Sequence, residues 1–190
     1  MMPQEEALRT YRDAVALDRH SGGPQLKISD GAAFLGCAEL AGHPRDPTAW
    51  RGFYDYANSA LPRPYNGLAD LYVILARAVM GDDAGLDARA RQMQRRSCEG
   101  RYPSGAYFPA LARGFASFER EDFSGAIAAL APLAGQNKRI GCRRAQHDLI
   151  EFTLLRAYIE ANRLQEAKRL LDIRRPGASG VPVVGIAAVH

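Results

Sequence analysis

The chain has 190 residues, of which 47% are hydrophobic and 24% are charged, a composition typical of one ordinary globular domain that excludes a disordered chain. The net charge of +4 is only mildly basic. No stretch approaches the ~18 uninterrupted apolar residues of a membrane span, and the acidic first residues lack the apolar core of a secretory signal.

The composition and the spacing of apolar residues predict helices. The chain has 32 Ala against 15 Val and Ile together. Ala is the best helix former, whereas strands favour β-branched residues. Apolar residues recur at helical spacing in nine segments, most of them separated by Gly or Pro. The predicted helices are 3–18, 30–41, 48–60, 66–80, 84–98, 105–120, 123–134, 145–162 and 163–174.

Three of these helices have candidate capping residues, one of which is Asp148 at the start of the helix at 145–162. Ser29 or Asp30 is expected to cap the helix at 30–41, and Thr48 the helix at 48–60. The preceding run of Ser, two Gly and Pro is expected to end the first helix.

Two further helices differ in polarity. Four arginines spread along 87–96 predict a solvated outer face for the fifth helix. The segment 145–162 is apolar nearly all round, which predicts a buried helix.

The pattern changes after Pro176. The segment 176–190 is rich in Gly, Pro and Val and has no charge before its terminal carboxylate. It cannot continue a helix, and its apolar content favours an extended arm docked on the surface over a mobile tail. The chain therefore divides into a helical domain, 1–175, and a C-terminal arm, 176–190.

Two pairs of predicted helices resemble each other. In 110–133 and in 149–176, an apolar helix ends in a polar turn that a large apolar residue and then Ala follow. The two alanines, Ala126 and Ala167, lie 41 residues apart, more than the ~34-residue tetratricopeptide period. With four such pairs in series, we expect an all-α fold, an irregular tetratricopeptide-like helix–turn–helix array that forms a right-handed α-solenoid.

A closer resemblance covers 101–175. This region resembles the C-terminal part of the tetratricopeptide repeat protein 38 family, which carries a motif like Ile-Gly-Gly-Ser-His-Ala-Gln-Arg-Asp between two such repeats. The matching residues are Ile140, Gly141, Ala145, Gln146 and Asp148. The chain departs from the motif at Cys142, Arg143, Arg144 and His147.

The resemblance extends upstream. Asp30 matches an Asp in a helix of the family, and Asp70 corresponds to an Asp that in the family precedes a His by two residues. Tyr72 stands in the place of that His. The resemblance implies a helical-repeat fold and says little about activity, and the missing histidines imply that any chemistry they served is lost.

The start of the chain suggests how it assembles. The run EEALRTYRDAV looks like the second helix of a pair whose first helix is absent. An uncapped end of a solenoid leaves an apolar face open. We therefore expect a second copy to cover this face in a homodimer.

The first functional hypothesis is a non-enzymatic module for protein–protein interaction. Arrays of this kind present a concave groove to a peptide or helix of a partner. The residues expected to line this groove are Asp70, Arg77, Tyr107, Arg113 and Arg156.

Two other hypotheses remain open. The first is an enzyme that uses the segment 140–148, with His147 and Asp148 as acid and base and Cys142 as nucleophile. The second is a binder of nucleic acid or another acidic ligand through the basic loop 138–144, which lacks the aromatic residues that stacking on single strands needs.

Sparse ligating residues argue against metals and cofactors. No two of the four histidines have the i,i+4 spacing of a helical zinc motif, and no phosphate-binding Gly-rich motif is present. We predict neither a metal nor a cofactor and assign no catalytic residue. Three cysteines far apart fit free thiols in the cytoplasm.

Overall fold

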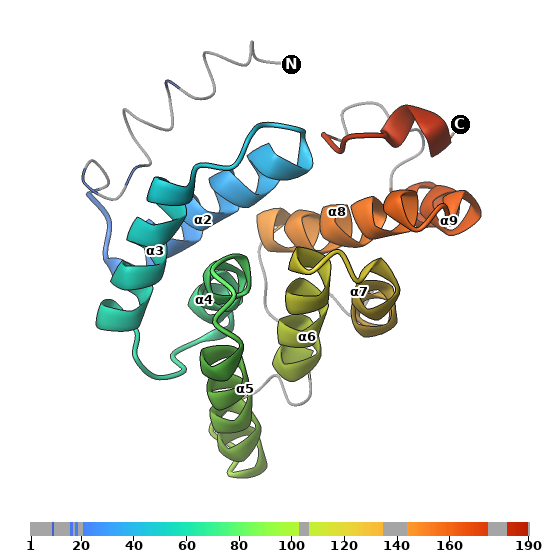
Figure 1. Ribbon diagram of the computed structural model, residues 1–190. Helices are drawn as coiled ribbons and strands as arrows, with labels where there is room; N and C mark the ends of the chain where they lie inside the picture. Colours follow the sequence, from blue (N-terminus) through green and yellow to red (C-terminus); the bar gives the residue numbers. More distant parts are fainter. Residues whose placement is uncertain are drawn as a thin grey trace.

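The computed structural model describes residues 21–102, 107–134, 144–174 and 182–189, together with residues 9, 16 and 18. This part of the chain holds eight α-helices, two short 3₁₀ turns and no strand, so the predicted all-α class is confirmed (Figure 1). The helices are α2 (Pro24–Leu40), α3 (Pro47–Ala60), α4 (Gly67–Val79), α5 (Asp83–Cys98), α6 (Tyr107–Glu119), α7 (Phe123–Leu130), α8 (Arg144–Glu160) and α9 (Leu164–Arg174). The 3₁₀ turns are η2 (Ala131–Leu133) and η4 (Ile186–Val189).

The start of α2 differs from the prediction. Pro24 opens this helix at its first position, where a proline lacks only an N–H that would have no helical partner. The helix therefore begins six residues before the predicted 30–41, and Ser29 is no cap. Its hydroxyl donates to the carbonyl of Gln25 inside the helix, at 2.6 Å.

The cap of α3 lies two residues before the predicted one. Asp46 accepts a hydrogen bond from the N–H of Ala49 at 2.9 Å, and Pro47 takes the first helical position. Thr48 therefore lies inside the helix and does not cap it. Side chains with the same role precede three other helices, namely Asn66, Asp82 and Asp122.

The four helix hairpins turn in the same way. The residues in the left-handed region after their first helices are Gly42, Gly81, Glu121 and Asn162, which follow one another at 39, 40 and 41 residues. The next N–H then donates to the carbonyl five residues back, as that of Asp82 does to Arg77 at 2.9 Å, and the same bond recurs in the other three hairpins. The predicted 41-residue spacing of Ala126 and Ala167 belongs to this series.

The hairpins pack in a closed circuit. The first helices α2, α4, α6 and α8 touch in sequence, and α3, α5 and α7 each pack on the first helix of the next hairpin. In addition, α8 packs directly on α2 (Figure 1). The core between the hairpins is built from large apolar side chains, among them Trp50, Phe53, Tyr72, Phe108, Phe115 and Leu149.

The C-terminal arm is docked where the structure describes it, over 182–189. The N–H of Val184 donates to the carbonyl of Leu40 at the end of α2, at 2.9 Å. Val183 and Val189 are buried. The expected docking is therefore confirmed for this part, although its last residues wind into η4 and are not extended.

The predicted helix at 3–18 lies outside the described residues except for three of its positions. Of the helices that the structure describes, none has the length and apolar character needed to cross a membrane.

Candidate functional site

A pocket of about 250 Å³ lies where three of the first helices reach their C-terminal ends. Leu40 from α2, Val79 from α4 and Glu119 from α6 line it at these ends. Thr153 of α8 and Val184 of the arm line it as well. The pocket therefore depends on the closure of α8 and the arm over α2.

The walls of the pocket are mostly apolar. The apolar lining from the helices comprises Leu40, Trp50, Leu75, Val79, Phe115, Phe118 and Leu149. Trp50 is the only tryptophan of the chain and is fully buried. Its fluorescence is therefore a direct reporter of what enters the pocket.

Two carboxylates at the pocket share one guanidinium. Arg45 donates to Glu39 at 2.6 and 2.9 Å and lies 2.8 Å from Glu119. The other oxygen of Glu39 accepts the indole N–H of Trp50. When all three groups are ionised, the two negative charges of the glutamates exceed the single positive charge of Arg45 by one.

The surroundings of Glu119 disfavour its negative charge. Burial raises the pKa of the Glu119 carboxyl above its usual range, Arg45 opposes this rise, and the charge of Glu39 adds to it. The C-terminal ends of α2, α4 and α6 also carry the negative end of their helix dipoles to this region. Arg77 in the last turn of α4 offsets the dipole there, whereas neither α2 nor α6 has a basic residue in its last turn.

Arg156 is the second cation at the pocket, and its charge is already matched. One of its terminal nitrogens pairs with Glu160 one turn along α8. The other donates to the carbonyl of Val184 in the arm, at 2.7 Å. This arginine therefore serves to hold the arm against α8.

Two of the predicted groove residues lie in the core. Asp70 is fully buried and accepts from the hydroxyl of Tyr102 at 2.6 Å and the N–H of Tyr65 at 3.0 Å. It also pairs with Arg89, which is itself buried, in contrast to the predicted solvated face of α5. Tyr107 is 7% exposed and belongs to the same core.

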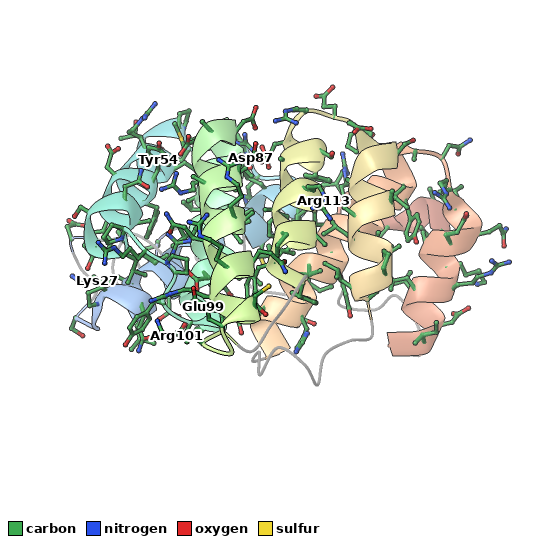
Figure 2. All side chains as sticks on the ribbon, turned by 90° about the horizontal axis from the view of Figure 1, so that it is seen from below. Lys27, Tyr54, Asp87, Glu99, Arg101 and Arg113 are labelled. Carbon is green, nitrogen blue, oxygen red and sulfur yellow. The ribbon has the colours of Figure 1, made fainter. Side chains whose placement is uncertain are left out.

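The other three predicted groove residues are spread over the molecule. Arg77 donates to Asp82 and to Asn58, which ties α4 to the helices on either side of it. Arg113 is exposed on α6, which stands between α5 and α7 (Figure 2). Of the five predicted residues, Arg156 alone lines the pocket, and the structure does not bring them together on one surface.

The motif segment 140–148 is only partly described. Gly141 lies outside the described residues, and so does the basic loop 138–144 apart from Arg144, which opens α8. Gln146 is buried and donates to the carbonyl of Leu68 at 3.1 Å. This bond holds the start of α8 against the first turn of α4, which is a structural role.

The proposed acid, base and nucleophile are not seen together. His147 is buried and Asp148 lies in the second turn of α8, past the N–H groups that a capping side chain serves. Cys142 lies outside the described residues. The thiol near Asp148 is instead Cys37, and burial together with the charge of Asp148 raises the pKa of Cys37 to about 11. A thiol protonated at neutral pH is a poor nucleophile.

Sequence reasoning missed the ionic cluster of Glu39, Arg45 and Glu119. A signal for it exists, because both glutamates lie in the last turn of a first helix. Acidic residues there oppose the helix dipole, so that two in equivalent hairpins are unexpected. The bridging arginine, in the loop after α2, has no such signal.

Among the residues that the structure describes, no group of three His, Cys, Asp or Glu side chains is arranged to hold a metal ion. Comparisons of the chain with protein-family models, with curated protein sequences and with solved structures find no match.

Proposed function

We propose that the chain is a non-enzymatic protein–protein interaction module that holds an extended segment of a partner protein at the pocket between α2, α6 and α8. The proposal keeps the function expected from the repeats and moves the binding site from the predicted groove to the pocket. The repeated hairpins support a tetratricopeptide-like array, a type of scaffold that commonly binds peptides. The resemblance to the tetratricopeptide repeat protein 38 family supports membership of that family.

The observation that carries the proposal is the way in which the arm lies at the pocket. The backbone of Val184 is held on both sides, since its N–H donates to the carbonyl of Leu40 and its carbonyl accepts from the guanidinium of Arg156, and its side chain lines the cavity. The same surface therefore accepts an apolar stretch of chain through hydrogen bonds to its backbone. A cavity of about 250 Å³ beside it suits one large side chain better than a drug-sized molecule.

The proposal is tested by filling the pocket. Val79→Phe adds an aromatic ring to the lining, and Ile173→Phe adds the same kind of ring to an exposed site on α9. Tagged wild-type protein and both variants are incubated with lysate of the source cells, and captured proteins are identified by mass spectrometry. We expect a discrete protein that wild type and Ile173→Phe retain and Val79→Phe loses by roughly tenfold or more.

Arg113→Glu distinguishes the pocket from the groove first expected. Capture that survives Val79→Phe but is lost in Arg113→Glu would move the site to the exposed face of α6. The absence of any captured protein would contradict the module itself. The homodimer and the cytoplasmic location stay predictions, the first of which sedimentation of the purified chain tests.

A further inference from the structure

The pocket combines an apolar cavity with unbalanced negative charge. The apolar walls include Trp50 and Phe118, and the carboxylates of Glu39 and Glu119 lie at the same cavity. One guanidinium, that of Arg45, serves both carboxylates. A ligand group that fills the cavity therefore meets more negative than positive charge.

The helix ends add to this imbalance. The C-terminal turns of α2, α4 and α6 all reach the pocket, and each carries the negative end of a helix dipole. Cations are the groups that such ends favour, and up to about half an elementary charge is attributed to each end. The dipoles and the carboxylates therefore favour the same sign of ligand.

An anionic ligand has no equivalent partner here. Arg156 is the cation that lines the pocket, and it is engaged with Glu160 and with the carbonyl of Val184. Arg45 is engaged with the two glutamates. A carboxylate in the ligand would have to break one of these pairs.

We infer that the partner segment carries an apolar side chain next to a lysine or arginine, and that the basic group binds at Glu119 while the apolar side chain fills the cavity. This inference rests on the proposed function, since it specifies what the pocket takes. Arg45 shows that a basic group can bind at these carboxylates, because its guanidinium bridges Glu39 and Glu119. Its own side chain is 41% exposed. The basic group of the partner supplies a second cation for the carboxylates of Glu39 and Glu119, beside Arg45.

The inference is tested with small probes that share one apolar body. Hexylammonium, 1-hexanol and hexanoate are titrated separately into the full chain, and Trp50 fluorescence reports binding in the pocket. We expect hexylammonium to bind roughly tenfold more tightly than 1-hexanol, and hexanoate to bind most weakly. Equal binding of the three probes, tighter binding of hexanoate, or no response of Trp50 to hexylammonium would overturn the inference.

Two variants identify the carboxylate. Glu119→Gln removes the negative charge at the pocket with little change in shape and should abolish the preference for hexylammonium over 1-hexanol. Glu99→Gln makes the same change at an exposed site (Figure 2) and should leave the preference intact. Retained selectivity in Glu119→Gln would overturn the assignment of this residue, and the comparison of probes on the wild-type chain stands even if the variant does not fold.

The pH dependence provides an independent check. The charged groups that face Glu119 or share its pocket are Arg45, Glu39 and Arg156. Because the pKa of Glu119 is raised, lowering the pH should neutralise this carboxylate and weaken hexylammonium binding while 1-hexanol binding stays the same. The probe tests could fail while wild type still captures a partner that Val79→Phe loses. That result would refute the charge preference and leave the proposed interaction module in place.

Discussion

At the scale of single residues, the clearest element of the structure is the buried network around Asp70. Its carboxylate forms an ion pair with Arg89 of α5 and accepts hydrogen bonds from the hydroxyl of Tyr102 and the N–H of Tyr65. Arg89 also donates to the carbonyl of Leu61 at 3.0 Å. The network therefore holds the connection between α3 and α4 against α5, and an unpaired buried charge would remain if one member were removed.

We expect Asp70→Ala to lower the free energy of unfolding by about 3–5 kcal/mol, because it leaves the guanidinium of Arg89 buried without its counter-ion. Asp87→Ala, an exposed carboxylate on the same helix as Arg89 (Figure 2), should change the free energy of unfolding by no more than about 0.5 kcal/mol. Urea unfolding followed by circular dichroism measures both. A similar small loss in the two variants would show that Asp70 is not needed to neutralise Arg89.

This network also shows what sequence reasoning can and cannot reach for individual residues. The spacing correctly placed Asp70 on a helix with a strongly apolar face, but a polar residue on such a face reads equally well as a groove residue or as half of a buried pair. Arg89 is 19 residues away, and its spacing from Leu86 and Met93 places it on the buried face of α5 without showing which carboxylate it meets there. A pair of this kind is decided by tertiary packing, which local periodicity does not record.

At the scale of helices and hairpins, contact between α2 and α3 depends on a glycine. The ring of Phe53 lies directly against the backbone of Gly31, in the space that a Cβ atom would take. Phe53 is itself 1% exposed and packed in the core. The ring has no room to withdraw, so the close approach of the two helices requires glycine at this position.

Gly31→Ala should therefore be destabilising, by about 1–3 kcal/mol, since it overpacks the core. At a solvent-exposed position in a helix, Gly→Ala would raise the free energy of unfolding by about 0.5–1 kcal/mol. The sign of the effect of Gly31→Ala therefore tests the packing. Thermal unfolding of Gly31→Ala, Phe53→Leu and the double variant forms the experiment. If Phe53→Leu does not relieve the cost of Gly31→Ala, the clash is not its cause.

Helix positions could be predicted well because helices are local. Periodicity placed all the helices that the structure describes, and most of their ends lie within two residues of the prediction. One exception is the end of α7, where the predicted 123–134 gives way to η2 after Leu130. The other is the start of α2, where Pro24 was interpreted as ending a helix although proline also suits the first turn of one. Which role applies depends on the residues that follow, and the weakly amphipathic segment after Pro24 gave little indication.

At the scale of the whole molecule, the candidate site could not have been predicted from the sequence. Its parts come from helices whose lining residues are separated by up to 120 residues, from Gly36 on α2 to Arg156 on α8, and from the arm beyond them. The sequence predicted four hairpins in series and an arm that docks, and these are the elements that line the pocket. The packing of α8 on α2, with the arm lying across both, is a long-range contact. Local sequence patterns do not encode such contacts.

The closure of α8 and the arm on α2 has a consequence for how the molecule unfolds. In a linear repeat array each repeat contacts only its neighbours, so the array can unfold from either end. Here the last hairpin packs on the first, so no hairpin is a free end that can unfold first. We expect the unfolding transition seen by Trp50 fluorescence, which reports α3, to coincide with that seen by circular dichroism, which reports every helix. Separate transitions would show that the first hairpin opens independently. A single transition would mean that a chain built by repetition folds as one cooperative unit, and its long-range contacts would then make refolding slow for an all-helical protein.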